Sequence, residues 1–82
     1  MLVNIKYFAS VREAIGRPDE VRETSSLSLA ALREELIARG SAYACLGRDR
    51  VIRMALNHVM SDEASLLEPG CEVAFFPPVT GG

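Results

Sequence analysis

The two segments with the strongest strand character lie at opposite ends of this 82-residue sequence. In residues 1–8, the apolar side chains of Val3, Ile5 and Tyr7 alternate with polar ones, which is typical of a strand with one buried face. Residues 71–76 are dense in apolar side chains, as expected for a strand covered on both faces. A chain of this length builds one small core. We therefore predict that the two terminal strands are neighbours in the middle of one sheet.

Two helices are predicted between these strands. Ser10 and Glu13 have the spacing of a capping box, and the short helix that they begin would end at Gly16. The second helix is expected to run from an N-cap at Ser28 to Gly40, which would close it in a left-handed conformation. One apolar face of this helix is expected to pack on the sheet, and it holds Leu29, Leu32 and Leu36.

The charged residues of the second helix are expected mostly away from its apolar face. They include Arg33, Glu34 and Arg39. Glu35 precedes Arg39 by four positions, which predicts a favourable ion pair along the helix.

Three further strands are predicted at residues 19–24, 51–56 and 59–60, the last two joined through Asn57 and His58. Residues 41–50 are predicted to form a loop. Leu66 and Leu67 are expected to enter the core ahead of a turn at Pro69 and Gly70.

The element order is therefore β-α-β-α-β-β-β, with the main helix packed on one face of a mixed sheet. We interpret this pattern as an α+β fold of the β-grasp (ubiquitin-like) kind. Residues 1–76 are expected to form the domain, and residues 77–82 an extended C-terminal tail.

Charge limits the partners that the chain attracts. Nine Lys and Arg residues against eleven Asp and Glu residues give a net charge of −2, so there is no overall attraction to nucleic acid or to an anionic membrane. Residues 54–82 carry four acidic residues and no basic one, which fits either a basic partner surface or a solvated acidic face. Arginine supplies eight of the nine basic residues.

Other functional classes are excluded or disfavoured by what the sequence omits. Cys45 and Cys71 are too few and too far apart for a disulfide framework or a zinc site, so we expect no bound metal. There is no apolar run near 18 residues and no signal peptide, so we expect a soluble, cytoplasmic protein. His58 is expected to be a turn residue, and the adjacent carboxylates of Asp62 and Glu63 to form a solvated turn.

The last six residues read Pro77-Pro78-Val79-Thr80-Gly81-Gly82. The prolines remove two backbone donors, so the final strand cannot continue beyond Phe76. They favour an extended segment that spans at most about 20 Å. The two glycines have no side chain and can enter a narrow channel or approach a bound ligand closely. A frayed terminus is the alternative interpretation.

The ending from Phe75 to Gly82 resembles the C-terminal signature of the molybdopterin synthase small subunit family, also called molybdopterin converting factor subunit 1. Weaker resemblances cover residues 7–13, 55–57 and 70–74, so the similarity extends over essentially the whole chain. Cys71 departs from the family, in which an aspartate is expected after the glycine.

This resemblance implies a β-grasp sulfur carrier that is not catalytic alone. A ubiquitin-activating-type adenylyltransferase would use ATP to convert Gly82 to an acyl-adenylate, and a sulfur donor would then leave a thiocarboxylate on Gly82. That sulfur would attack cyclic pyranopterin monophosphate in the active site of the large subunit to form the dithiolene of molybdopterin. No cofactor would be bound permanently. The resemblance also implies a heterotetramer, with two large subunits at the centre and a small subunit at each end.

Partner binding would use the tail residues Phe76, Pro77, Pro78, Val79, Thr80 and Gly81. One of Phe75 and Phe76 is expected in the core and the other in an exposed patch, and the pattern does not say which. A role for Cys45 or Cys71 as a persulfide carrier is disfavoured, because nothing marks either thiol as activated.

Three alternative functions remain. The chain could be a ubiquitin-like modifier whose Gly82 is joined to lysines of target proteins, although the Pro-Pro-Val-Thr stretch argues against it. It could carry sulfur for another pathway, such as thiamin, cysteine or tungsten-cofactor synthesis. It could also be a binding module with a frayed end, in which case removal of Gly82 would leave its activity intact.

Overall fold

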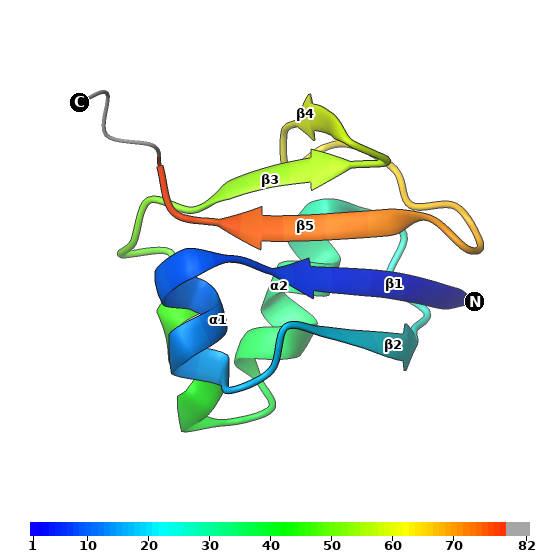
Figure 1. The fold of residues 1–82 in the computed structure, drawn as a ribbon. Coiled ribbons are helices and arrows are strands. Elements are labelled where there is room, and N and C mark those ends of the chain that lie inside the picture. Colours follow the sequence, from blue (N-terminus) through cyan, green and yellow to red (C-terminus); the bar gives the residue numbers. More distant parts are fainter. Residues whose placement is uncertain (79–82) are drawn as a thin grey trace.

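Five strands form one mixed sheet in the computed structural model, which describes residues 1–78. The strands are β1 (Leu2–Tyr7), β2 (Asp19–Glu23), β3 (Arg53–Leu56), β4 (Val59–Ser61) and β5 (Glu72–Phe76). Their order across the sheet is β2-β1-β5-β3-β4 (Figure 1). The terminal strands β1 and β5 are parallel neighbours near the centre, as predicted, and the remaining neighbouring strands are antiparallel.

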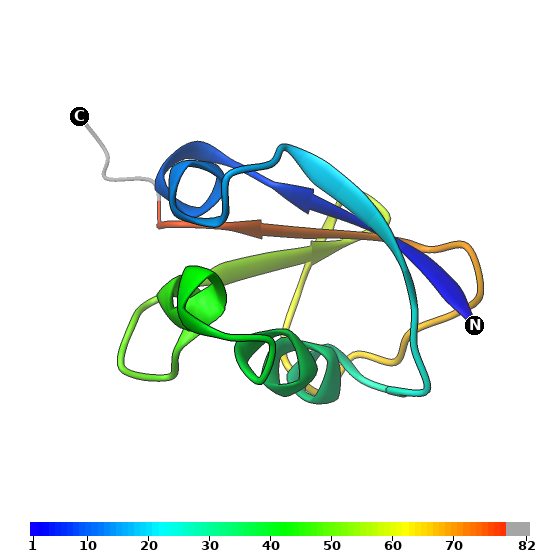
Figure 2. The same cartoon turned by 90° about the horizontal axis from the view of Figure 1, so that it is seen from below.

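The helices lie on one face and at one end of this sheet. They are α1 (Ala9–Ile15), α2 (Leu29–Ile37) and a 3₁₀ helix (Ser41–Leu46). Figure 2 shows α2 and the 3₁₀ helix on the same face, while α1 lies at the end of the sheet where β1 and β5 finish. The 3₁₀ helix occupies part of the predicted loop, because the side chains of Tyr43 and Leu46 are buried and hold it against the core. The predicted ubiquitin-like β-grasp architecture is confirmed.

The core lies between the sheet and α2. All three leucines predicted for the buried face of α2 have no exposed surface. They pack with side chains from the two central strands, namely Val3, Ile5, Tyr7, Val73 and Phe75. Val11 of α1 closes the core at the end of the sheet.

The start of α1 differs from the predicted capping box. The N-cap residue is Phe8 and no side chain caps the helix, because β1 passes directly into α1 and Ser10 already lies inside it. The carbonyl of Phe8 accepts hydrogen bonds from the backbone N–H groups of Val11 and Arg12. Ala9 makes this abrupt junction with a φ of 51°, in the left-handed region. The helix ends at Gly16, as predicted, with a φ of 88°.

The N-cap of α2 is Ser28, as predicted, and its hydroxyl accepts a hydrogen bond from the N–H of Ala31 at 3.2 Å. The segment before β5 supplies carbonyl partners for the first two N–H groups of the helix.

This segment also contains Leu66 and Leu67, which were both predicted to enter the core, and the structure corrects that prediction. Leu67 is buried, but Leu66 is 69% exposed because it pairs with Ser28 at the rim of the fold.

The end of α2 also differs from the prediction. The helix finishes at Ile37, and Ala38 at its C-cap keeps a right-handed helical conformation. Gly40 has φ 130° and ψ −171° and is the N-cap of the 3₁₀ helix, so it does not close α2. The predicted pair between Glu35 and Arg39 is absent from the described residues, because each side chain reaches a different part of the fold.

The strands β3 and β4 form the predicted hairpin through Asn57 and His58, whose φ angles are 50° and 69°. Two consecutive positive φ angles are typical of the type I′ turn that matches the twist of a hairpin. The predicted strand 51–56 begins later, at Arg53.

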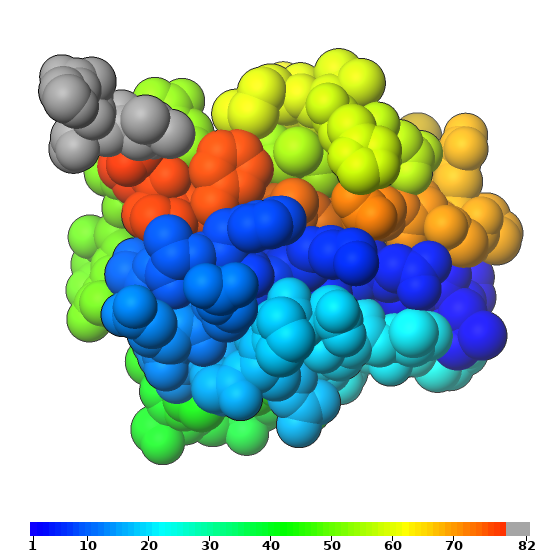
Figure 3. All heavy atoms as spheres, in the orientation of Figure 1, coloured from blue at the N-terminus to red at the C-terminus, as the bar shows by residue number. Residues whose placement is uncertain are grey.

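The structure corrects the prediction that β5 is covered on both of its faces. Val73 and Phe75 point into the core, whereas Ala74 and Phe76 lie on the opposite face of the sheet. The helices do not cover that face (Figure 2). Figure 3 shows atoms of β1, β5 and the β3–β4 hairpin at the surface there. The apolar sequence of β5 therefore reflects one core face and one apolar surface face, not burial under two layers.

Candidate functional site

The candidate site begins where β5 ends. The strand finishes at Phe76, as predicted, and Pro77 and Pro78 follow it with half-buried side chains. The predicted site residues Val79, Thr80, Gly81 and Gly82 lie outside the described residues. The tail therefore leaves the domain from a central strand of the sheet, next to the junction of β1 and α1 (Figure 1).

The two adjacent phenylalanines of β5 have different environments. Phe75 has no exposed surface, and its ring stacks on the ring of Tyr7 with centroids 6.3 Å apart. Phe76 is half-buried on the uncovered face and lies edge-on to Phe8, with centroids 6.4 Å apart and ring planes at 86°. Phe75 is thus the core residue, and Phe76 is the one available to a partner.

An apolar patch extends from these rings across the uncovered face of the sheet. We define the sheet patch as Phe8, Ala55, Met60, Ala74 and Phe76. Ala55 and Ala74 are opposite each other on β3 and β5, and Met60 of β4 is opposite Ala55. The side chains of the two alanines are short, whereas those of Phe8 and Met60 are 46% and 59% exposed. The two alanines themselves are buried, so the exposed apolar surface comes from Phe8, Met60 and part of Phe76. Apolar surface of this kind marks a candidate protein-binding site.

Positive charges lie beside the sheet patch. Arg53 is exposed and is the cross-strand partner of Phe76, and Lys6 is the partner of Ala74. The ammonium group of Lys6 lies 4.0 Å from the carboxylate of Asp19 on β2. The end of the patch nearest the tail is therefore apolar with a cationic margin.

A small cavity of about 150 Å³ lies at the root of the tail. It is lined by Ser10, Val11, Ala14, Cys45, Arg50, Val51, Ile52 and Pro77. Burial raises the pKa of the Cys45 thiol and outweighs the opposing effect of Arg50, so the thiol is protonated at neutral pH. This environment is the opposite of an activated cysteine.

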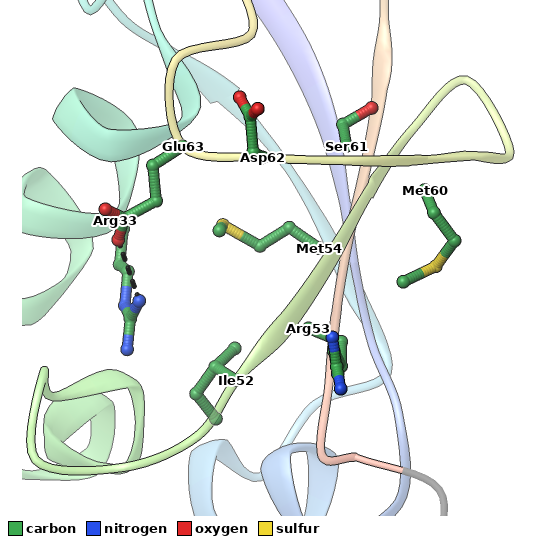
Figure 4. Close-up of a pocket in the computed structure, with 8 residues that line it drawn as sticks. All are labelled: Arg33, Ile52, Arg53, Met54, Met60, Ser61, Asp62 and Glu63. Carbon is green, nitrogen blue, oxygen red and sulfur yellow. Dashed lines mark hydrogen bonds and ion pairs between the residues drawn. The ribbon is translucent and has the colours of Figure 1, made fainter.

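A larger, open pocket of about 280 Å³ lies between the β3–β4 hairpin and α2 (Figure 4). Arg33 lines it and corrects the prediction that this residue lies away from the buried face, because the residue is only 6% exposed. Its guanidinium donates to the carbonyls of Leu46 at 2.6 Å, Gly47 at 3.0 Å and Arg50 at 3.3 Å. These bonds tie the end of the 3₁₀ helix and the following loop to α2.

The carboxylate of Glu63 accepts a hydrogen bond from the guanidinium of Arg33 at 2.9 Å (Figure 4). Glu63 also accepts from the exposed Arg48, and hydrogen bonds from Arg48 and Arg33 lower the pKa of its carboxyl. The prediction of a solvated turn therefore misses the structural role of this carboxylate. The carboxylate of Glu63 is bonded to Arg33 and Arg48, and that of Asp62 accepts from the N–H of Ala64, so these two adjacent carboxylates have separate structural partners and do not act as an acid–base pair.

A second buried network was not predicted from the sequence. The carboxylate of Glu20 on β2 accepts from Tyr7 at 2.8 Å, Tyr43 at 3.0 Å and Arg39 at 2.7 Å. Burial alone would raise the pKa of Glu20, but these three hydrogen bonds outweigh it and lower the pKa below its ordinary value. Burial and the bond to Glu20 also raise the pKa of Tyr7. The network joins β1, β2, the turn that follows α2 and the 3₁₀ helix.

The remaining candidate residues carry no catalytic arrangement. His58 is in the predicted turn, its side chain is 81% exposed, and its only ionic contact among residues 1–78 is with Glu72 at 3.3 Å. Within the same residues, no cluster of three or more histidine, cysteine, aspartate or glutamate side chains could hold a metal ion. None of the helices in this part of the chain is both long and apolar enough to span a bilayer.

A mixed sheet with a central-strand exit for the tail, helices packed on one face and an apolar patch on the uncovered face define a ubiquitin-like domain. The family model described as the ThiS family matches residues 5–82. The chain belongs to the ThiS family.

Relatives agree with this assignment. A molybdopterin synthase sulfur carrier subunit from Haemophilus influenzae is 35% identical over 81 residues, which cover 99% of this chain and 100% of the relative. The family resemblance predicted from the sequence is therefore confirmed.

Two solved structures show the same fold over 100% of both chains. SAMP1 from Haloferax volcanii, a small archaeal modifier protein, has a TM-score of 0.78 at 21% identity. A complex of subunits 1 and 2 of the molybdopterin-converting factor from Helicobacter pylori has a TM-score of 0.71 at 23% identity. Carriers and modifiers share this fold, so the fold alone does not separate the two functions.

Proposed function

We propose that this chain is the sulfur-carrier small subunit of molybdopterin synthase. The observation that carries the proposal is the ending Pro-Pro-Val-Thr-Gly-Gly directly after the central strand β5. It occurs in a chain that is 35% identical, over nearly its full length, to a protein named for that role.

The chemistry requires activation of Gly82. A C-terminal carboxylate has a pKa near 3.5, so it is an anion at neutral pH and a poor electrophile. Attack of the carboxylate on the α-phosphate of ATP gives the acyl-adenylate and releases pyrophosphate. A sulfur donor then forms the C–S bond as AMP leaves, which produces the thiocarboxylate. A ubiquitin-activating-type adenylyltransferase would supply the nucleotide site.

The large subunit would receive the tail and dock on the sheet patch. Phe76 and Phe8 lie at the root of the tail, so a partner that binds them also fixes where the tail begins. The prolines at 77 and 78 limit the conformations of the outlet, which lowers the entropy lost on insertion. The thiocarboxylate sulfur of Gly82 would then attack cyclic pyranopterin monophosphate, and two deliveries would complete the dithiolene.

The chain would act as a donor and not as a catalyst by itself. The buried ionic groups at Glu20 and Arg33 bond within the fold, in networks that hold its elements together. The large subunit would therefore supply the cations that bind the phosphate of the precursor. A heterotetramer with two central large subunits would place one tail in each active site.

Mass spectrometry of the intact chain tests this proposal. The chain is incubated with an activating enzyme, ATP and a sulfur source, and a variant lacking Gly82 serves as the control. We expect one oxygen to be replaced by sulfur, located at Gly82, and no change in the control. The modified chain should then convert cyclic pyranopterin monophosphate to molybdopterin when mixed with the large subunit.

Two results would contradict the proposal. An isopeptide bond between Gly82 and lysines of other proteins would support the modifier function. A thiocarboxylate that the large subunit does not consume would support sulfur transfer in another pathway.

A further inference from the structure

The chain carries very few amines. Lys6 is the only lysine among nine basic residues, and the amino group of Met1 is the other primary amine. Arginine and lysine carry the same charge but differ in reactivity. A guanidinium stays protonated, whereas lysine, with a pKa near 10.4, always has a small neutral fraction that can attack an acyl group. This difference matters if Gly82 is activated, so the inference below rests on the proposed function.

Two arginines lie beside the root of the tail. Arg53 is directly opposite Phe76 in the β3–β5 pair, and Arg50 lines the same small cavity as Pro77. Both residues are exposed. Six residues span at most about 20 Å, so both side chains lie within the distance that Gly82 can cover. A lysine at either position would offer an amine to the activated acyl group.

The two amines that the chain does have are both paired with acidic groups. The amino group of Met1 donates to Glu23 at 2.9 Å and to the carbonyl of Thr24 at 2.8 Å, at the opposite end of the sheet from the tail (Figure 1). Lys6 is opposite Ala74, two residues before Phe76, so it lies near the root of the tail, and its ammonium group is turned toward Asp19 on β2, 4.0 Å away.

The two cysteine thiols are also kept from reacting with the activated C-terminus, one by its distance and burial and the other by its partial burial. Cys71 is only 4% exposed and precedes β5, at the opposite end of that strand from Phe76. Cys45 lies near the root of the tail, but its half-buried thiol donates to the carbonyl of Ala42 at 3.7 Å. Burial raises the pKa of this thiol, so little thiolate is present at neutral pH.

We infer that the domain shields the activated C-terminus from its own nucleophiles. Arg50 and Arg53 provide positive charge beside the tail without an amine, Lys6 is paired with Asp19, and the remaining amine and thiols of the chain are paired, buried or distant. The avoided reaction is self-acylation. In it, an amine nitrogen forms a C–N bond with the carbonyl carbon of Gly82, the C–O bond to AMP breaks, AMP leaves with the electron pair, and the amine loses a proton to water. The product is an internal amide that is one water lighter than the free acid.

The test uses the full chain prepared with an alkyl thioester at Gly82, so it does not depend on the activating enzyme. The wild type, Arg53→Lys, Arg50→Lys and Arg53→Gln are incubated at micromolar concentration and about pH 8.5, where roughly 1% of a lysine amine is neutral. Arg53→Lys retains the charge and adds an amine, whereas Arg53→Gln removes the charge and adds none. Circular dichroism checks that each exposed substitution leaves the domain folded.

We expect the wild type and Arg53→Gln to hydrolyse mainly to the free acid. Each lysine variant should form internal amide at a rate at least about tenfold above the wild type, because a neutral amine is tethered near the acyl group at millimolar effective concentration. Tandem mass spectrometry should place the new amide at residue 53 or 50. Treatment with hydroxylamine separates stable amides from thioesters at Cys45.

The inference is wrong if the lysine variants behave like the wild type. It is also wrong if the wild type forms an amide at Lys6 or Met1, or a thioester at Cys45, as fast as Arg53→Lys forms its amide. A parallel reaction with the activating enzyme, ATP and hydroxylamine should trap Gly82 as a hydroxamate. Absence of the hydroxamate, with the thioester results as expected, would contradict the proposed function and not the shielding.

Discussion

The ring of Phe76 lies edge-on to the ring of Phe8, with centroids 6.4 Å apart and planes at 86°. The contact joins the last residue of β5 to the residue that links β1 with α1, on the face that the helices leave uncovered. It couples the start of the tail to a fixed point of the domain surface.

Phe76→Ala should weaken binding to the large subunit about tenfold or more, because aromatic side chains at the centre of an interface dominate its energy. Its effect on stability should be modest, since the ring is half-buried. Isothermal titration calorimetry and thermal unfolding measure the two effects. Phe75→Ala is the matched control and should destabilise the fold by about 3–5 kcal/mol through a core cavity. Equal losses of stability in the two variants would mean that Phe76 is a core residue.

Deletion of Gly82 should abolish sulfur transfer and leave the melting temperature nearly unchanged. The reacting carboxyl group is lost, while the described core lies entirely within residues 3–75. A synthase assay with the large subunit and thermal unfolding of the free chain check the two halves of this prediction. Full activity of the shortened chain would contradict the proposed mechanism.

Glu20→Gln should destabilise the protein at pH 7 by about 1–3 kcal/mol, because a hydrogen-bonded carboxylate is lost from the network with Tyr7, Tyr43 and Arg39. The lowered pKa of Glu20 means that its stabilisation is present above the pKa of the unfolded chain, about 4.3, and is lost as the pH falls through the lower folded value.

Urea unfolding from pH 7 to pH 3 measures this effect. The wild type should lose more stability over this range than Glu20→Gln, because the variant lacks the titrating group. Glu13→Gln, which removes an exposed carboxylate of α1 outside this network, is the matched control. Identical pH dependence for Glu20→Gln and the wild type would show that the network does not stabilise the ionised carboxylate.

Arg33→Met should cost about 3–5 kcal/mol of stability, because it removes the donor for three backbone carbonyls and the buried partner of Glu63. Arg48→Met removes the other arginine that binds Glu63, but this side chain is exposed, so its melting temperature should stay close to that of the wild type. Equal effects of the two substitutions would mean that the shared ion pair, and not the carbonyl bonds, gives Arg33 its importance.

Local patterns were sufficient for most of the fold. The alternation in β1, the leucine face of α2 and the hairpin turn at Asn57 and His58 follow from the spacing of neighbouring residues, and all are observed. Local rules failed where a tertiary contact competes with them. The capping box at Ser10 is absent because β1 passes directly into α1, and Glu35 bonds with Arg22, Thr24 and Ser26 instead of Arg39.

The candidate site was likewise predicted only in part from the sequence. Its covalent part, a tail of two prolines and two terminal glycines after an apolar strand, is a property of consecutive residues and can be read directly from the chain. The family resemblance rests on the same residues, and the comparisons confirm it. The Glu20 network gave no usable signal, because its four members come from segments that are distant in the sequence, and only Tyr7 was predicted to be buried.

Local sequence patterns are enough to specify the strand and helix periods, the end of β5 and the chemical character of the tail, because each depends on residues adjacent or a few positions apart. The packing of distant segments is what buries Phe75 but leaves Phe76 half-buried, makes Arg33 and Glu20 internal, and keeps one face of the sheet open. Burial is a non-local property. It depends on which segments pack over a side chain, and in this fold α2 and the 3₁₀ helix cover one sheet face and leave the other uncovered.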